Sequence, residues 1–260
     1  MSVTRPYYRT CRQFSDGSYS EGGRWRYIVH PKYAKSPQHY VRAFLLIQKD
    51  VQALFDYVEP ADANLKCFSF RIQELLFRAC VEVEANLRAI ILENGYEKKN
   101  KKGHDLNLNI KDDYVKLENT HRLSSYKAKV PLWHGSKSIR IPFENWGPEH
   151  PSPAWYRAYN KSKHDRYNEF EGATFEQMID AVCGLFVVLS SQFHTQDFAP
   201  GASHLVTEDQ VGDGMENGIG DYFRVYFPDD WPADDRYEFD WETIKNDQNP
   251  FRTIDYTPSK

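Results

Sequence analysis

The chain has 260 residues, 40% of them hydrophobic, and a formal net charge of −4 at pH 7, values that predict one sizeable core with appendages. The longest apolar run, at residues 181–189, is far shorter than the roughly 20 residues of a bilayer-spanning helix, so we expect no membrane contact. The N-terminus turns polar at once, which favours a cytoplasmic location. The four cysteines are scattered without a CxxC pair or a histidine at ligand spacing, which indicates reduced thiols and no metal or other cofactor.

The first 35 residues mix aromatic residues with glycine, serine and proline, a composition that predicts loops with one or two short strands. One of these strands should cover RWRYIVH, residues 24–30. An amphipathic helix follows, because apolar residues recur at helical spacing after a candidate cap at Ser36 and a proline at position 37. This helix should end near Pro60.

A longer amphipathic helix is predicted within residues 67–96, with Gly95 as its stop. The short connection to the preceding helix favours an antiparallel pair. On this helix Glu74, Arg78 and Glu82 recur every four residues along one line. Such a line is typical of surface ion pairs, and the alternative is a carboxylate placed in a polar site.

Residues 97–150 form an insertion with little helical periodicity. A charged loop comes first, and a short helix is predicted within residues 112–129. Two short strands should then flank His134 to Ser138, with Gly135 in the turn.

Two further helices complete the expected core. Neither glycine nor proline occurs from Ala154 to Glu171, so this stretch can be helical, with Ser152 as a candidate cap and Pro153 at the first position. Another helix is predicted over residues 174–193, capped by Thr174. The expected fold is therefore mainly α, a four-helix core within residues 36–196 with small β additions in residues 1–35, in the insertion and in the C-terminal segment.

The C-terminal segment is acidic. Residues 197–260 contain fifteen acidic and five basic residues, a net charge of −10, so residues 1–196 carry +6. The aromatic residues near RVYF, residues 224–227, favour a strand that docks on the body. The segment can shield an anion-binding surface or engage a basic protein partner, and the alternative is a solvated addition.

The run RAYNKSKHDRY, residues 157–167, gathers positive charge around a histidine. In a helix, residues at i, i+3 or i+4, and i+7 return to one face, here over roughly 10 Å along the axis. This polar stripe consists of Arg157, Asn160, Lys161 and His164, with Lys163 and Arg166 to its side.

Two interpretations of the polar stripe are open. A guanidinium matches a phosphate, and an imidazole with an ordinary pKa of roughly 6.5 exchanges protons at neutral pH. Together they suit cleavage of an RNA phosphodiester, which needs a base, an acid and a positive partner for the phosphate. The alternative is a solvated helix face with weak surface ion pairs.

A four-helix core whose third helix carries Arg157, six further residues and then His164 resembles the HEPN superfamily. Members typically have an arginine, about four to six residues and a histidine, and many are metal-independent RNases of toxin, antiviral-defence or RNA-processing systems. The resemblance implies that Arg157 binds the scissile phosphate, that His164 is the general base or acid, and that two copies form a composite groove as a homodimer. The substrate-binding residues would be Asn160, Lys161, Lys163 and Arg166.

Position 158 departs from the family pattern. Many active members have a polar residue directly after the arginine, whereas this chain has Ala158. The alternative function is therefore a non-catalytic dimeric interaction module or a nucleotide-sensing module. The sequence contains no P-loop, dinucleotide-binding or hydrolase-elbow motif, and His104, His134 and His150 lack metal-ligand spacing.

Overall fold

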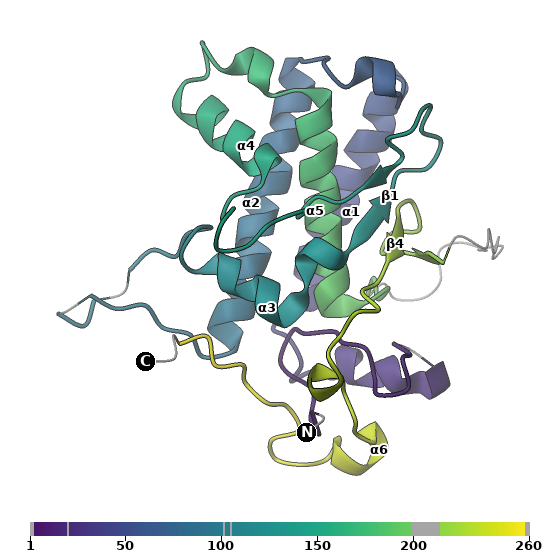
Figure 1. Cartoon of the computed structure of the whole chain (residues 1–260), viewed down its shortest axis with the longest axis vertical. Helices are drawn as coiled ribbons and strands as arrows, with labels where there is room; N and C mark the ends of the chain where they lie inside the picture. Colours follow the sequence, from purple (N-terminus) through teal and green to yellow (C-terminus); the bar gives the residue numbers. More distant parts are fainter. Residues whose placement is uncertain (1–2, 20, 101, 105, 199–213, 258–260) are drawn as a thin grey trace.

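The computed structural model is mainly helical, with a small antiparallel sheet at one side of the helices (Figure 1). The main helices are α1 (Pro37–Phe55), α2 (Phe70–Glu93), α4 (Ala154–His164) and α5 (Phe175–Phe193). The structure describes residues 3–19, 21–100, 102–104, 106–198 and 214–257. The shorter elements are η1 (Glu21–Val29), η2 (Asp62–Asn64), η3 (Tyr114–Leu117), α3 (Glu118–His121), η4 (Leu123–Ser125), β1 (Lys127–Lys129), β2 (Ile139–Arg140), η5 (Phe170–Gly172), β3 (Glu216–Asn217), β4 (Arg224–Tyr226), η6 (Ala233–Asp235) and α6 (Trp241–Ile244), where η marks a 3-10 helix.

The apolar helix α5 is the centre of the core. All but a few of its residues are buried, and it contacts α1, α2 and α4. Phe186 of α5 stacks on Phe44 of α1 with ring centroids 5.8 Å apart. On the α4 side, the Trp155 indole lies against Gly184, where a Cβ atom would be only 3.0 Å from the ring. Helix α5 is apolar on all of its faces over residues 181–189, as is typical of a helix that other helices surround.

Of the three predicted N-cap residues, one caps its helix through its side chain and two do not. Thr174 accepts a hydrogen bond from the Gln177 amide at 3.3 Å, which confirms the predicted cap of α5. Ser36 stands before α1 as predicted, but its backbone is left-handed and its side chain makes no capping bond. The predicted cap of α4 at Ser152 is wrong, because Pro153 takes the cap position and Ala154 is the first helical residue.

Helix α4 is shorter than predicted, ending at His164 instead of near Glu171. Asp165 leaves the helical conformation at φ −137° and ψ 76°. Its carboxylate accepts hydrogen bonds from the Asn168 backbone and side-chain amides, at 3.2 and 2.8 Å. An aspartate that bonds the backbone three residues ahead stabilises a turn at the expense of the helix.

The N-terminal strand predicted over residues 24–30 is wrong, because residues 24–29 belong to η1. Tyr27 and Ile28 are consecutive and both buried, whereas a strand would place them on opposite faces. In the described part of residues 1–35 the only strand-like pairings are isolated bridges at Val3, Tyr7 and Phe14.

The predicted hairpin in the insertion is confirmed with different bounds. β1 pairs antiparallel with β2, and the connection between them is longer than the predicted turn. The predicted C-terminal strand is also confirmed, since β4 pairs antiparallel with β1, with Val225 opposite Ala128. Together with β3 the strands form a sheet in the order β2-β1-β4-β3.

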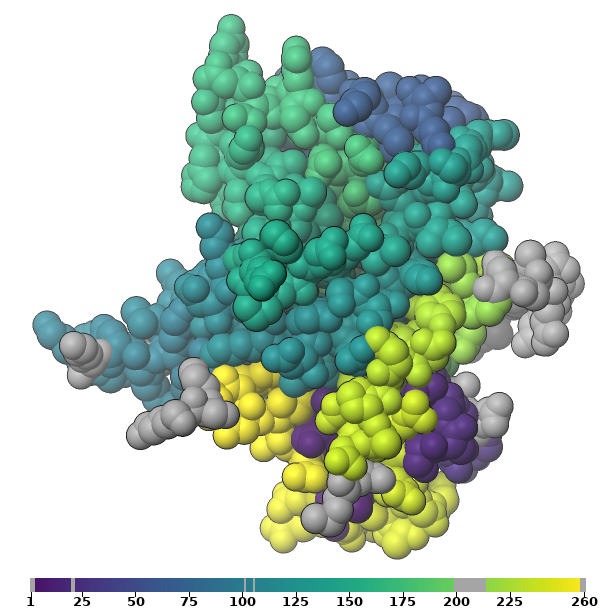
Figure 2. Space-filling model, viewed as in Figure 1, coloured from purple at the N-terminus to yellow at the C-terminus, as the bar shows by residue number. Residues whose placement is uncertain are grey.

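The N-terminal and C-terminal segments pack together at one end of the molecule (Figure 2). Tyr237 is central: its amide donates to the Gln13 carbonyl at 3.0 Å and its hydroxyl to the Thr10 carbonyl at 2.7 Å. The Arg252 amide donates to the Pro6 carbonyl at 2.8 Å. The described part of the acidic segment, residues 214–257, is thus packed into the structure. No helix in the described ranges is long and apolar enough to span a membrane.

Candidate functional site

The outer face of α4 carries the polar stripe predicted from the sequence. Arg157, Lys161 and His164 are exposed, and Asn160 is half-buried. The opposite face of the helix is buried and consists of Trp155, Tyr156, Tyr159 and Ser162. The stripe is therefore accessible to a ligand.

Contacts of the buried face fix the rotation of α4 about its axis. The Trp155 indole donates to the Pro142 carbonyl at 2.7 Å, and the Tyr156 hydroxyl donates to the Glu84 carboxylate at 2.6 Å. Tyr159 packs edge-on against Phe77 of α2 with ring centroids 5.3 Å apart. Burial and the neighbouring Glu84 carboxylate raise the pKa of Tyr156, so this hydroxyl remains a donor.

A hollow of about 290 Å³ lies beside the stripe, between α4 and the N-terminal end of α5. Arg157 and Lys161 line it, whereas Asn160 and His164 do not. Because Thr174 is the cap of α5, the positive end of that helix dipole faces this region. The lining consists of Lys66, Ala154, Arg157, Ala158, Lys161, Glu169, Gly172, Thr174, Glu176 and Gln177.

Lys66 is a cation of this hollow that the sequence did not indicate. It lies in the connection between α1 and α2, far from α4 in the chain. The spacing of charges within one helix carries no information about such a residue. Two carboxylates, Glu169 and Glu176, also line the hollow, and the Lys161 ammonium lies 4.0 Å from Glu169. An anion would therefore compete with Glu169 for Lys161.

Arg157 and His164 stand at different heights on the helix. The Arg157 guanidinium donates to the Ser152 carbonyl and keeps further N–H donors for an anion. His164 is the last helical residue, roughly 10 Å further along the axis. Helical side chains lean toward the N-terminus, so both groups lie over the turn that precedes their own residue.

The two cations predicted beside the stripe lie over aromatic rings. The Lys163 ammonium is 5.2 Å from the centre of the Tyr159 ring. The Arg166 guanidinium lies 5.1 Å from the centre of the Phe70 ring, beyond the end of α4. All six predicted site residues thus lie on α4 or in the turn that follows it.

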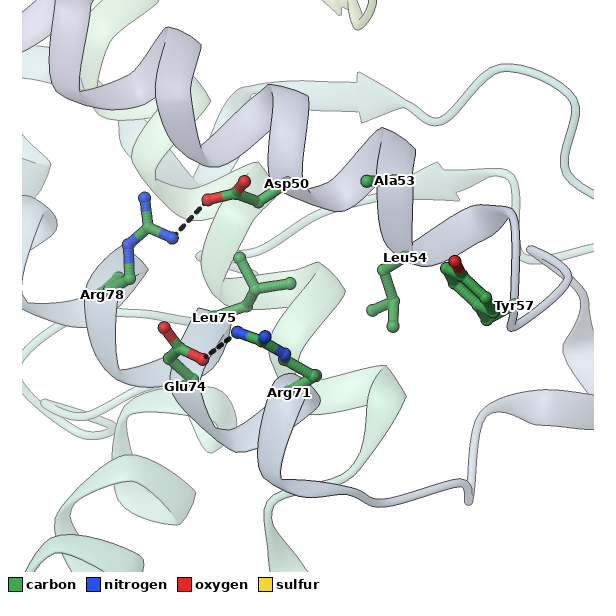
Figure 3. A pocket seen from close by; sticks show the side chains of 8 residues that line it. All are labelled: Asp50, Ala53, Leu54, Tyr57, Arg71, Glu74, Leu75 and Arg78. Carbon is green, nitrogen blue, oxygen red and sulfur yellow. Dashed lines mark hydrogen bonds and ion pairs between the residues drawn. The ribbon is translucent and has the colours of Figure 1, made fainter.

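A second hollow, of about 310 Å³, lies between α1 and α2 (Figure 3). Its two arginines already have partners: Arg78 pairs with Asp50 of α1, and Arg71 pairs with Glu74 at 3.0 Å. Of the predicted line of charges on α2, Arg78 pairs across the helices with α1, and Glu74 pairs with a residue outside the line. Such exposed pairs are weak, but both arginines of this hollow face a carboxylate, whereas Arg157 beside α4 donates to a backbone carbonyl.

His134 and His121 lie in different surroundings, the first exposed and the second buried. Within the described residues, no three His, Cys, Asp or Glu side chains gather to hold a metal ion. His134 is exposed and lies 3.2 Å from Glu59. His121 is fully buried, and its Nε2 lies 3.0 Å from the Arg9 carbonyl. Burial lowers the pKa of His121 to about 3, so it is a neutral core residue at physiological pH.

Comparison with protein-family models, with curated proteins and with solved structures gives no match to this chain.

Proposed function

We propose that this protein is a HEPN-like RNA-binding protein whose polar stripe on α4 cleaves RNA without a metal ion. The observation that carries the proposal is the joint exposure of Arg157, Lys161 and His164 on the outer face of one helix. A guanidinium and an ammonium suit the phosphates of a strand, and an imidazole suits proton transfer. A place in a toxin or antiviral-defence system follows from the resemblance alone.

The chemistry would be attack of the ribose 2′-hydroxyl on the adjacent phosphorus. His164 accepts the 2′-hydroxyl proton or donates a proton to the departing 5′-oxygen, while Arg157 stabilises the charge on the phosphate. The new bond joins the 2′-oxygen to phosphorus and the bond to the 5′-oxygen breaks. The products are a 2′,3′-cyclic phosphate and a 5′-hydroxyl.

A homodimer is part of this proposal. The reaction uses both a base and an acid, whereas one stripe supplies one imidazole, His164. A second copy facing the first would supply the other imidazole and extend the row of cations, as the resemblance implies.

The second candidate is a non-catalytic interaction or nucleotide-sensing module. Ala158 lines the hollow where many active HEPN proteins have a polar residue, and Glu169 and Glu176 lie in the same hollow. These carboxylates weaken the attraction for a highly charged strand. In this case a basic protein partner for the acidic C-terminal segment, or a mononucleotide at Arg157, would be the ligand.

The test is incubation of the purified protein with mixed single-stranded RNA in EDTA, followed by identification of the product termini. We expect cyclic phosphate ends, and we expect Arg157→Ala to lower the cleavage rate strongly. Arg71→Ala is a matched control, because the Arg71 side chain is 81% exposed and lies on α2 at the other hollow. Cleavage that stops in EDTA, or that is equally slow in both variants, would contradict the proposal. Intact RNA would favour the interaction module.

A further inference from the structure

The turn after α4 presents an aromatic side chain to solvent. Tyr167 is 93% exposed, and Phe70, at the start of α2, is 62% exposed. Arg166 is adjacent to Tyr167 in the chain, and its guanidinium lies over the Phe70 ring. Large exposed apolar side chains that gather at one place mark interaction sites more often than scattered ones.

This turn is held in place by its own hydrogen bonds. The Asp165 carboxylate binds Asn168, as described above, and the Glu169 amide donates to the Asp165 carbonyl at 3.0 Å. The Ser162 hydroxyl of α4 donates to the Glu169 carbonyl at 2.8 Å. Tyr167 is thus presented on a short structured turn, and a ligand would not need to order the backbone first.

Phe70 is supported from behind by other rings. Its ring centroid lies 4.6 Å from that of Phe170, and Phe170 in turn packs edge-on against Phe68 at 5.5 Å. We call Phe70, Arg166 and Tyr167 the aromatic platform. The platform continues directly from His164, the last residue of the polar stripe on α4.

We infer that Tyr167 of the aromatic platform stacks an unpaired base of single-stranded RNA whose phosphates lie along the polar stripe. Aromatic rings interleaved with cations are the feature by which proteins bind single strands, because every base offers a π-face and every linkage a phosphate. Paired bases in a duplex are stacked on each other and do not offer their faces to the platform. The inference rests on the proposed RNA-binding function and adds to it a substrate class and a stacking residue.

The test is binding of the full chain to a fluorescently labelled single-stranded oligonucleotide with 2′-O-methyl riboses, which cannot be cleaved by 2′-hydroxyl attack. We expect Tyr167→Ala to weaken binding roughly tenfold to a hundredfold, the scale of losing one stacked base. Tyr167→Phe keeps the ring and should bind within about twofold of the wild type. Tyr57→Ala is the matched control, since Tyr57 is 88% exposed but lies at the hollow between α1 and α2.

The same titration with an oligonucleotide that lacks bases separates stacking from other contacts. Tyr167→Ala should have little effect on that ligand, because the platform then has no base to hold. An equal loss with both ligands would overturn the inference. Wild-type binding that Lys161→Ala weakens and Tyr167→Ala does not would also overturn it, while leaving the proposed function in place. Absence of wild-type binding at low salt would overturn both.

Discussion

Histidines in this protein occupy two opposite environments. His164 is exposed at the end of α4, whereas His121 and His194 are buried in the core. The His194 ring stacks on Phe227 with centroids 4.4 Å apart, and on its other neighbour, Tyr19, at 5.8 Å. Of these three, only His164 is accessible to a ligand, while the buried ones link folding to pH.

The stability of the protein should fall in acid partly because of His194. Burial lowers the pKa of His194 to about 4 from an ordinary value of 6.5. Between these two pH values the unfolded chain binds a proton that the folded chain excludes, so the unfolding free energy decreases as pH falls below 6.5. The loss reaches up to about 3 kcal/mol near pH 4, at 1.36 kcal/mol per pKa unit.

His194→Phe removes the titration while keeping an aromatic ring against Phe227 and Tyr19. Urea unfolding of both proteins at several pH values measures the difference. We expect the variant to lose less stability than the wild type between pH 6.5 and pH 4. Parallel pH dependences would contradict the assignment of this titration to His194.

The β1–β2 hairpin is held by one carboxylate from η2. Asp62 accepts hydrogen bonds from the Trp133 indole at 2.7 Å and from the amides of Ser136 and Lys137 at 2.8 and 3.1 Å. These donors lower the pKa of Asp62 to about 2, so the carboxylate stays charged at neutral pH. Gly135 lies close against this carboxylate: a Cβ atom at position 135 would be 2.3 Å from the Asp62 carboxyl carbon.

Gly135→Ala should therefore destabilise the protein. The backbone φ of this residue is 124°, a value that residues with a side chain rarely adopt. The added methyl group would also displace the Asp62 carboxylate. We expect a loss of about 1–3 kcal/mol, the usual cost of a strained backbone position, measured by chemical denaturation. Gly147→Ala is the matched control, since a Cβ atom at Gly147 would have no neighbour within 4 Å and its φ is not left-handed. Equal stability of the two variants would contradict this role of the Asp62 carboxylate.

The long helices could be predicted from the sequence, whereas the turns and the full lining of the site could not. Periodic apolar residues and nearby breakers determine α1, α2 and α5, and the stripe on α4 follows from helical geometry. The early end of α4 depends on local bonds between Asp165 and Asn168, which compete with helix continuation. Lys66 joins the hollow only through tertiary packing, so no local pattern indicates it.

On the scale of the whole molecule, the structure changes the interpretation of the basic body, residues 1–196, and the acidic segment, residues 197–260. Part of the positive charge is buried, and part of the acidic segment lies far from the polar stripe. Arg9, Arg12 and Arg140 belong to the basic body but are buried, so they cannot attract an external anion. The described residues after 227 lie at the end of the molecule opposite α4 (Figures 1 and 2). They are therefore not placed to shield the stripe, and residues 199–213 and 258–260 of the same segment lie outside the described ranges.

Deletion of residues 214–260 should destabilise the chain instead of exposing a binding groove. The deletion removes Tyr237, which packs edge-on against Phe14 and Tyr27 with centroids 5.9 and 5.8 Å apart. The buried aromatic surface left behind would be exposed to water, at a cost of roughly 25 cal/mol per Å². We expect a lower Tm or insoluble protein. A truncated protein with the wild-type Tm would show that the segment is not part of the core.

The measurement that tests the RNA-cleaving role most directly is the cleavage rate of single-stranded RNA in EDTA by His164→Ala, compared with His134→Ala. Both side chains are exposed histidines, but His134 lies in the hairpin connection, away from α4. We predict a loss of roughly 10²–10⁴-fold for His164→Ala, the usual contribution of a general acid or base, and an unchanged rate for His134→Ala. A His164→Ala protein that cleaves at the wild-type rate would contradict the catalytic role of the α4 stripe.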